Sequence, residues 1–205
     1  MQKLYEKYYI ESDNEQCDLY EFLSTMFHVT NALYPGSFVQ ISPSFYIPYV
    51  CYIDGNRKAK SVFKHIQNVA DYIQPRASYL EDVKLSFYYQ DYTKPINEPK
   101  DSFDLLITQY TKLEDPVYKQ YLKKGGHVLA TDCMGNASRV SLDGDFILAG
   151  IFNRLGGKYY FSQDNLKEYF IPKSKDKDIA LHLRETGRGA SYKKAAAYYL
   201  FKKVR

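Results

Sequence analysis

Residues 121–130 read YLKKGGHVLA, and this stretch decides how the rest of the chain is interpreted. The pair Gly125-Gly126 is typical of a helix end followed by a turn, because glycine readily adopts the left-handed conformation that ends helices. The apolar residues after the turn have the length and composition of a buried strand. We therefore predict a helix over 115–123, capped by Asp115, a tight turn, and a strand over 127–130.

The same alternation of helices and strands continues on both sides of this unit. Apolar residues at helical spacing predict further helices over 13–27, 57–73 and 163–170, the first opened by a capping box between Asp13 and Gln16. Short apolar runs predict seven strands, at 31–34, 50–53, 83–89, 103–108, 127–130, 146–152 and 197–202. The predicted fold is α/β: a doubly wound, mostly parallel seven-stranded sheet with helices on both faces and an antiparallel C-terminal hairpin at one edge.

Composition limits the class of protein. Hydrophobic residues make up 45% of the chain and charged residues 25%, which is typical of a globular protein rather than a disordered one. No apolar run is long enough to span a membrane, and the polar N-terminus has no signal-peptide pattern, so we expect a cytoplasmic protein. Three scattered cysteines and four histidines without metal-ligand spacing favour neither a disulfide framework nor a metal site.

Charge and aromatic content leave the partner open. The net charge of +4 permits a nucleic-acid partner without requiring one. The chain has 22 Tyr, 12 Phe and no Trp. Tyrosines can stack on bases, but most of these are expected to fill a core with their hydroxyls reaching the surface.

Four segments together resemble the class I S-adenosylmethionine (SAM) dependent methyltransferases. The segment YLKKGGHVLA resembles the family's LKPGG turn into its fifth strand, and FDLLI at 103–107 resembles its FDLI fourth strand. The segment YID at 52–54 resembles the second strand with its acidic end, and Gln90-Asp91 resembles the polar pair after the third strand. The resemblance implies a single Rossmann-like methyltransferase-type domain over 1–205, with 1–30 as an N-terminal helical extension and SAM as the cofactor.

The resemblance also implies which residues would bind SAM. Ligands of doubly wound sheets bind at the carboxyl ends of the strands. The resemblance places Asp54 and the adjacent Gly55 at the ribose, and Gln90 or Asp91 at the adenine amino group. The turn that would face the methionine end consists of Tyr34, Pro35, Gly36 and Ser37. A turn-forming role for Asp54 and plain solvation for Gln90 and Asp91 are the alternatives.

The sequence departs from the family pattern in two places. The first loop keeps one glycine, Gly36, followed by the bulky Phe38, where the family usually has a GxGxG-like turn. After the fourth strand, Thr108-Gln109-Tyr110-Thr111 stands where amino-methylating enzymes of this fold have (D/N/S)PP(Y/F), and no cysteine nucleophile is present there. Gln109 and Tyr110 are therefore the candidate catalytic residues, which would orient a substrate, Tyr110 by stacking.

Residues 184–194 form a basic, glycine-containing segment that predicts a substrate contact. Arg188 and Lys193 could bind phosphates and Tyr192 could stack on a base, although a solvated hairpin loop is the alternative. The predicted function is a SAM-dependent methyltransferase acting on a nucleic acid or a small molecule.

The alternative function is a methyltransferase-like domain that has lost catalysis and binds a protein or nucleic-acid partner. In that case Phe38, Phe45 and Tyr46 are candidates for filling the cofactor cleft. A different nucleotide-binding Rossmann-like enzyme is less favoured, because both GxGxxG and GxxxxGK[ST] are absent.

Overall fold

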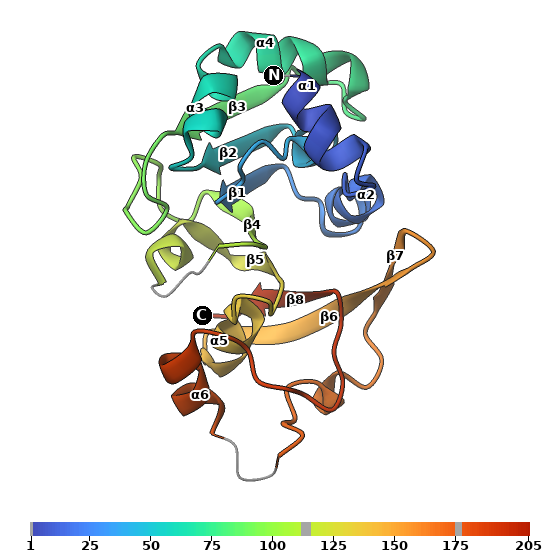
Figure 1. The fold of residues 1–205 in the computed structure, drawn as a ribbon, viewed down its shortest axis with the longest axis vertical. Coiled ribbons are helices and arrows are strands. Elements are labelled where there is room, and N and C mark those ends of the chain that lie inside the picture. The colour runs from blue at the N-terminus through green and yellow to red at the C-terminus, as the bar shows by residue number, and fades with distance from the viewer. Residues whose placement is uncertain (1, 112–115, 175–177) are drawn as a thin grey trace.

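The computed structural model of this protein describes residues 2–111, 116–174 and 178–205. Within them, eight strands form one sheet in the order β3-β2-β1-β4-β5-β8-β6-β7 (Figure 1). The strands are β1 (Asn31–Pro35), β2 (Tyr49–Ile53), β3 (Lys84–Tyr88), β4 (Phe103–Thr108), β5 (Leu122–Ala130), β6 (Phe146–Leu155), β7 (Lys158–Ser162) and β8 (Tyr198–Lys203). The predicted α/β class with a mostly parallel sheet is confirmed.

The N-terminal half of the sheet is parallel. Strand β1 pairs with β2 and with β4, β2 pairs with β3, and β4 pairs with β5, all in parallel. Residues 50–53 are fully buried because both faces of the sheet are covered there. Burial on both faces explains why these strands read as continuous apolar runs rather than alternating ones. The carboxyl ends of β1, β2 and β4 therefore lie at one edge of the molecule.

The C-terminal half of the sheet is antiparallel, but its arrangement corrects the prediction. Strand β8 lies between β5 and β6 and runs antiparallel to both, so the last strand is interior rather than at an edge. The edge hairpin consists of β6 and β7 instead. The turn between them is Gly156-Gly157, and both glycines have positive φ, which suits a tight hairpin. The sheet thus has eight strands, not seven.

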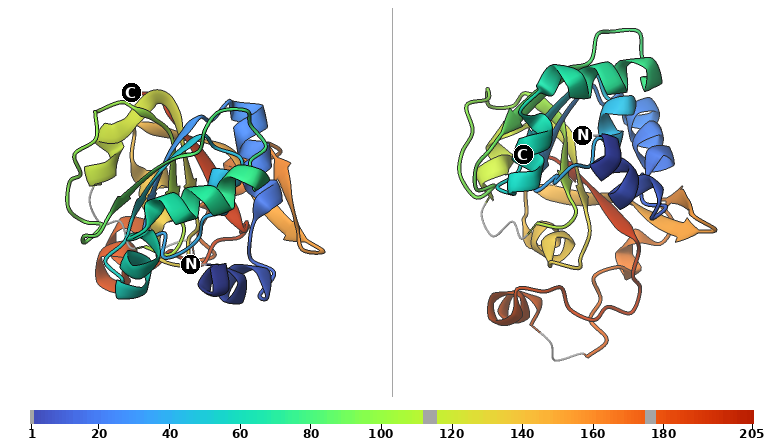
Figure 2. Two further views of the ribbon diagram at one scale, coloured as in Figure 1. Left: turned by 90° about the horizontal axis from the view of Figure 1, so that it is seen from above. Right: turned by 45° about the horizontal axis from the view of Figure 1, so that its top comes forward.

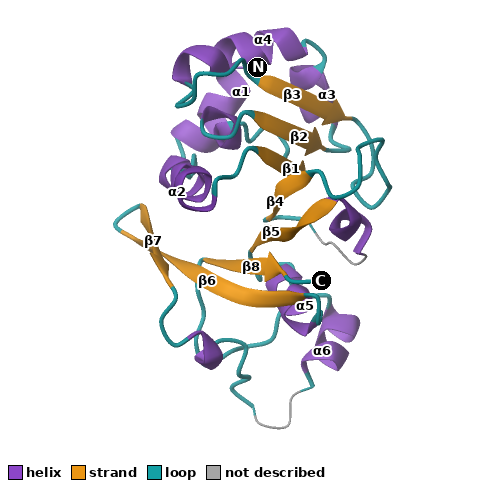
Figure 3. Ribbon diagram, turned by 180° about the vertical axis from the view of Figure 1, so that it is seen from behind, coloured by secondary structure: helices purple, strands orange, loops and turns teal. Residues whose placement is uncertain are grey.

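Helices cover both faces of the sheet, as predicted (Figures 2 and 3). On one face, buried residues of α2 (Cys17–Phe27), α3 (Arg57–Phe63) and α4 (Ile66–Ile73) share a core with Tyr34, Tyr52 and Ile107. On the other face, α5 (Asn136–Leu142) shares a second core with Leu33 and Leu106, and α6 (Ile179–Thr186) packs on α5. Neighbouring residues of a strand thus enter opposite cores.

Several predicted helices differ in the structure. The helix expected over 57–73 is interrupted, because His65 has φ −112° and ψ 67°, outside the helical region. The helix expected over 115–123 is a 3-10 helix at Pro116–Tyr121, and β5 begins at Leu122; the expected cap, Asp115, lies outside the described residues. The segment 163–170 contains only the 3-10 turn Leu166–Glu168. Neither α5 nor α6 was predicted.

The N-terminal segment packs on the sheet. It contains α1 (Gln2–Tyr5), a π-helical turn at Glu6–Ile10 and α2. The Tyr5 side chain is buried and its hydroxyl lies 2.7 Å from Ser42 Oγ. The expected capping box at Asp13 and Gln16 is not made, because Gln16 has φ 62° and its side chain is used elsewhere. Of the described helices, none is long and apolar enough to cross a membrane.

Candidate functional site

Asp54 lies at the carboxyl end of β2 and ties the loop after β1 to that strand. Its Oδ2 accepts a hydrogen bond from the Phe38 N–H at 2.7 Å, and its Oδ1 accepts one from the Asn56 N–H at 2.6 Å. Only 9% of Asp54 is exposed. Each carboxylate oxygen can still accept a further hydrogen bond. Asp54, the predicted ribose-binding residue, therefore also holds the loop that contains Gly36 and Ser37 in place.

Gly36 is covered by a side chain from the segment that follows β4. Its φ is +65°, and its N–H donates to the Ile53 carbonyl at 2.7 Å. A Cβ at this position would lie 1.6 Å from Thr111 Cγ2, beyond the end of β4. The absence of a side chain at Gly36 therefore makes room for Thr111, where the sequence predicted room for a cofactor. Neither Tyr34 nor Pro35 is open to solvent; Tyr34 is buried and Pro35 is buried at the end of β1.

Two buried hydroxyls beside this turn have no hydrogen-bond partner in the part of the chain that the structure describes. They are Ser37 Oγ and Thr111 Oγ1, and these residues are 1% and 3% exposed. A buried hydroxyl without a partner is costly, and native structures contain few of them. Polar groups of a bound molecule would satisfy both hydroxyls, so the ends of β1 and β4 have unused hydrogen-bonding capacity.

Gln90 and Asp91, the predicted adenine-binding pair, form hydrogen bonds with the backbone of their own loop. Gln90 Nε2 donates to the carbonyls of Lys94 and Pro95, both at 3.1 Å. Asp91 Oδ1 accepts from the Thr93 N–H at 2.8 Å, and this hydrogen bond lowers the pKa of the fully exposed Asp91. The backbone of Gln90 lies against Gly55, 3.4 Å from where a Cβ would be. The structure thus brings Asp54, Gly55 and Gln90 together, while Asp91 faces solvent.

Gln109 lies inside a buried polar network rather than at a surface. Its Oε1 accepts from the Tyr34 hydroxyl at 3.0 Å, and its Nε2 donates to Gln16 Oε1 at 2.8 Å and to the Tyr20 hydroxyl at 2.9 Å. Burial raises the pKa of Tyr20 and of Tyr34 well above the usual value, so both phenols stay protonated. Gln109 therefore joins the N-terminal end of α2 to β1 and to the segment after β4, and it is fully buried. Sequence reasoning missed Gln16 and Tyr20, since no local pattern connects them to Gln109.

Tyr110 opens onto a cleft at the carboxyl end of β5. This cleft, called the β5 cleft below, has a volume of about 590 Å³. Tyr110 is 57% exposed. The other lining side chains that matter here are Thr131, Asp132, Cys133, Arg154, Tyr159 and Tyr198. The cleft combines aromatic walls with a few polar groups, an arrangement typical of small-molecule sites.

Asp132 is a second functional candidate that the sequence did not single out. Burial raises its pKa, although its oxygens accept hydrogen bonds from the N–H and the hydroxyl of Ser138, both at 2.8 Å. Among the described residues that line the β5 cleft, it is the only carboxylate. Its position directly after β5 was the available signal, because ligands of such sheets gather at the carboxyl ends of strands.

The predicted substrate-binding residues are divided between surface and interior. Arg188 and Lys193 are exposed. Tyr192 is 6% exposed; its hydroxyl lies 2.5 Å from Ser138 Oγ, and its ring packs on Phe170 at a centroid distance of 5.2 Å. It contributes to the wall of the β5 cleft. A base would reach an open ring at Tyr110 more readily than at Tyr192.

The aromatic residues considered as fillers have different positions. Phe38 adopts φ 49° and its ring packs edge-on against Tyr8 at 5.1 Å, so the N-terminal segment covers the loop held by Asp54. Phe45 belongs to the buried core and packs edge-on against Tyr5 at 6.1 Å. Tyr46 is partly buried against the same core.

Neither a cluster of metal ligands nor a disulfide is found among the described residues. No group of three or more His, Cys, Asp or Glu side chains could hold a metal ion among those residues. The three cysteines, Cys17, Cys51 and Cys133, are free.

Comparisons with known proteins concern the fold. No protein-family model matches the sequence, and no curated protein matches it. Among solved structures, the chain is similar to a methyltransferase from Geobacter sulfurreducens, with 11% identity and a TM-score of 0.48 over 71% of this chain and 75% of that one. It is similar to the N-methyltransferase NodS from Bradyrhizobium japonicum, with 13% identity and a TM-score of 0.47 over 76% of this chain and 95% of that one.

A third similar structure is the tRNA (m1A58) methyltransferase TrmI from Aquifex aeolicus, with 11% identity and a TM-score of 0.45 over 91% of this chain and 68% of that one. All three are methyltransferases by name. None of the three reaches a TM-score of 0.5, so the assignment of a function has to rest on the geometry of the site.

Proposed function

We propose that this chain binds SAM at the carboxyl ends of β1 and β2 and transfers its methyl group to an acceptor held in the β5 cleft. The observation that carries the proposal is the position of Asp54. Its carboxylate is buried at the end of β2, holds the loop after β1, and retains the capacity to accept two more hydrogen bonds. A ribose diol is a ligand that would use both.

The residues around Asp54 fit this cofactor on one condition. The unpaired hydroxyls of Ser37 and Thr111 supply polar groups where the methionine end would lie. Thr111 Cγ2, however, fills the space above Gly36. Binding therefore requires the Thr111 side chain, which lies in the loop after β4, to adopt another χ1 rotamer.

The reaction would need little chemistry from the protein. When bound, SAM would supply an electrophilic methyl group for transfer to the acceptor, and the chain would hold the two reactants in line. Tyr110 would orient the acceptor by stacking, because its ring is exposed at the mouth of the β5 cleft. Asp132 would take the proton that the acceptor loses, since it is the carboxylate on the lining of that cleft among the described residues. Most of the acceleration would come from alignment.

A second candidate function is a methyltransferase-like domain that binds a partner without SAM. The contact between Thr111 and Gly36 favours it, because the site is then closed by the chain's own side chain. The use of Gln109 in a buried network points the same way. The two functions differ in whether the wild-type chain binds SAM or SAH despite this contact.

Calorimetric titration with S-adenosylhomocysteine (SAH) tests the proposal. We expect micromolar binding by the wild type and at least about tenfold weaker binding by Asp54→Asn, because a hydrogen bond to a charged group contributes about 1.5–3 kcal/mol. Asp82→Asn is the matched control at an exposed carboxylate and should bind like the wild type. Thr111→Ser removes Cγ2 but keeps the hydroxyl, and it should bind SAH more tightly than the wild type. If neither the wild type nor Thr111→Ser binds millimolar SAH, the proposal fails and the second candidate function stands.

A further inference from the structure

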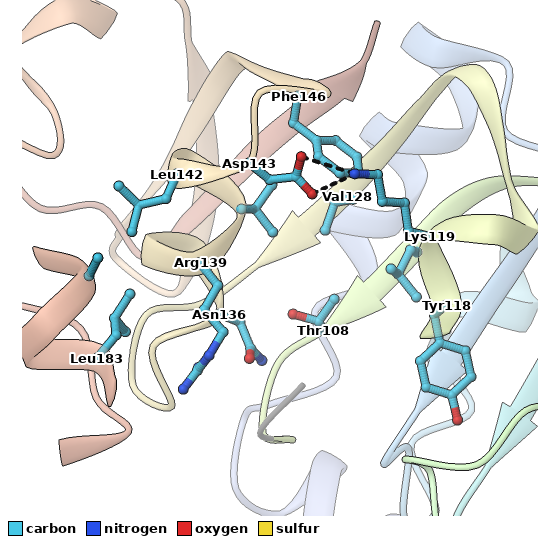
Figure 4. Close-up of a pocket in the computed structure, with 13 residues that line it drawn as sticks. Thr108, Tyr118, Lys119, Val128, Asn136, Arg139, Leu142, Asp143, Phe146 and Leu183 are labelled. Atoms are coloured by element: carbon cyan, nitrogen blue, oxygen red, sulfur yellow. Dashed lines mark hydrogen bonds and ion pairs between the residues drawn. The ribbon is translucent and has the colours of Figure 1, made fainter. Parts of the chain in front are cut away.

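A second cavity lies apart from the site just described. It has a volume of about 410 Å³ and is lined by residues of α5, α6, the 3-10 helix Pro116–Tyr121, β4 and β5 (Figure 4). None of its lining residues lines the β5 cleft. Its volume is within the range of sites that hold small organic molecules, about 300–1,000 Å³.

Most of the cavity wall is apolar. The sheet contributes Leu106 and Val128, α5 contributes Val140 and Leu142, and α6 contributes Leu183. Such a wall favours a ligand with an apolar body, because its burial removes apolar surface from water on both sides. The polar groups of the cavity are few, and they decide what the remainder of the ligand must be.

Thr108 supplies an unused hydrogen-bond donor inside the cavity. The residue is 1% exposed, and no group of the described residues forms a hydrogen bond with its Oγ1. Figure 4 shows this hydroxyl directed toward the side of the cavity formed by Asn136 and Arg139. A buried hydroxyl without a partner is unusual in a native protein, so a ligand acceptor at this point would satisfy it.

Arg139 places a positive charge at the same side, where it interacts electrostatically with the nearby Asp132 but forms no direct ion pair among the described residues. Its Nη1 donates to the Met134 carbonyl at 2.7 Å and its Nη2 to the Gly187 carbonyl at 3.4 Å. A guanidinium has five N–H donors, so three remain. These two carbonyls fix the orientation of the guanidinium without cancelling its charge.

The other cation of the cavity is already neutralised. Lys119 Nζ lies 2.7 Å from Asp143 Oδ2 and 2.5 Å from Asp145 Oδ2. Burial alone would lower the pKa of Lys119, but the two carboxylates raise it overall, so this group is a charged, paired cation. The cavity therefore has one end where the cation is held in direct ion pairs and one end, at Arg139, where the cation has no direct ion pair among the described residues.

We infer that this cavity binds a small amphipathic carboxylate, with its apolar chain against Leu106, Val128 and Leu183 and its carboxylate between the Thr108 hydroxyl and the Arg139 guanidinium. A carboxylate accepts from both donors at once and neutralises the charge, which a neutral acceptor of the same shape would not do. The inference is independent of SAM binding, because neither Asp54 nor any residue given for the lining of the β5 cleft lines this cavity.

Calorimetric titration with sodium octanoate tests the inference. We expect saturable binding at one site by the wild-type chain, and weaker binding of the neutral alcohol 1-octanol. Thr108→Val keeps the shape of the side chain and removes the hydroxyl, and Arg139→Gln removes the charge. Each should weaken octanoate binding about tenfold, as expected for the loss of one hydrogen bond to a charged group.

Two control variants and one stability measurement separate the loss of octanoate binding from other effects of the substitutions. Arg184→Gln removes an exposed arginine of α6 that does not line the cavity, and it should bind octanoate like the wild type. Asp54→Asn should also bind octanoate normally, which separates this site from the proposed SAM site. Thr108→Val should unfold cooperatively at no lower temperature than the wild type, because the hydroxyl it removes is unpaired. No saturable binding at millimolar octanoate, or equal affinity in Thr108→Val, Arg139→Gln and the wild type, would overturn the inference.

Discussion

At the scale of single residues, Gly36 has a role that its neighbours in sequence do not reveal. The sequence predicted a turn glycine at the end of the first strand, and the positive φ agrees with that prediction. The atom that uses the free space is Thr111 Cγ2, from beyond β4. A contact between the segments that follow β1 and β4 depends on how the two strands pair in the sheet, so only the structure could show it.

Gly36→Ala should lower the free energy of unfolding by about 2–4 kcal/mol, because alanine is strained at this φ and its Cβ would overlap Thr111. Urea unfolding measures the effect. Gly144→Ala is the matched control, since no heavy atom lies within 4 Å of a Cβ there. In Gly36→Ala combined with Thr111→Ala, part of the loss should be recovered. Strictly additive effects of the two substitutions would show that the contact is absent.

His127 gives a pH-dependent contribution to stability. It is 9% exposed on β5, and burial together with Lys202 lowers its pKa to about 4. In the unfolded chain the pKa is near the ordinary value of 6.5. The unfolded state therefore binds more protons below that pH, and the stability that neutral His127 contributes is lost as the pH falls from about 6.5 toward 4.

From about pH 7 to about pH 4.5, the wild type should lose about 2–3 kcal/mol of unfolding free energy that His127→Leu does not lose. Urea unfolding at the two pH values measures the difference. His65→Gln, at an exposed histidine, should follow the wild type. If His127→Leu loses as much stability on acidification as the wild type, the histidine does not stay neutral in the folded state.

At the scale of elements, the strands were more predictable than the helices. Four of the six residues of β4 and all five of β2 are apolar, and burial on both faces of the sheet explains why such apolar runs indicate strands here. Helix α5 was missed because its seven residues, NASRVSL, have no apolar stripe, and it starts from the left-handed Gly135. Strand β7 was missed because KYYFS is only half buried at the sheet edge.

The network around Gln109 connects α2 to β1 and β4. Gln109→Leu should lower the free energy of unfolding by about 2–4 kcal/mol, because it leaves the buried hydroxyl of Tyr34 and the amide of Gln16 with fewer partners. Tyr110→Phe, at the exposed neighbouring residue, is the control and should change stability by less than about 0.5 kcal/mol. Equal unfolding midpoints in urea for Gln109→Leu and the wild type would mean that the network does not hold these elements together.

At the scale of the whole molecule, the order of the strands in the sheet could not be predicted from sequence patterns. Strand β8 was predicted as a strand, but its place between β5 and β6 was not. Its residues 198–201 are buried on both faces, and such an apolar run suits any interior position of a sheet. The partners of a strand are set by contacts between distant parts of the chain, which a single sequence does not display.

The candidate site shows the same limit. Asp54, Gly55 and Gln90 were predicted as neighbours because the carboxyl ends of parallel strands meet at one edge, and the structure places them together. The sequence could not show that Thr111 covers Gly36 or that Gln109 is enclosed, since both depend on side chains that meet only after the sheet has formed.

The most direct test of the account is to map SAH onto the molecule by the amide resonances of the ¹⁵N-labelled chain. The account predicts that the largest shifts on adding SAH occur at Gly36, Ser37, Phe38, Asp54 and Gly55, the residues at the ends of β1 and β2. It predicts no comparable shift at Val140 or Leu183, which line the separate cavity. An unchanged spectrum at millimolar SAH, or shifts confined to that cavity, would contradict the proposed SAM site.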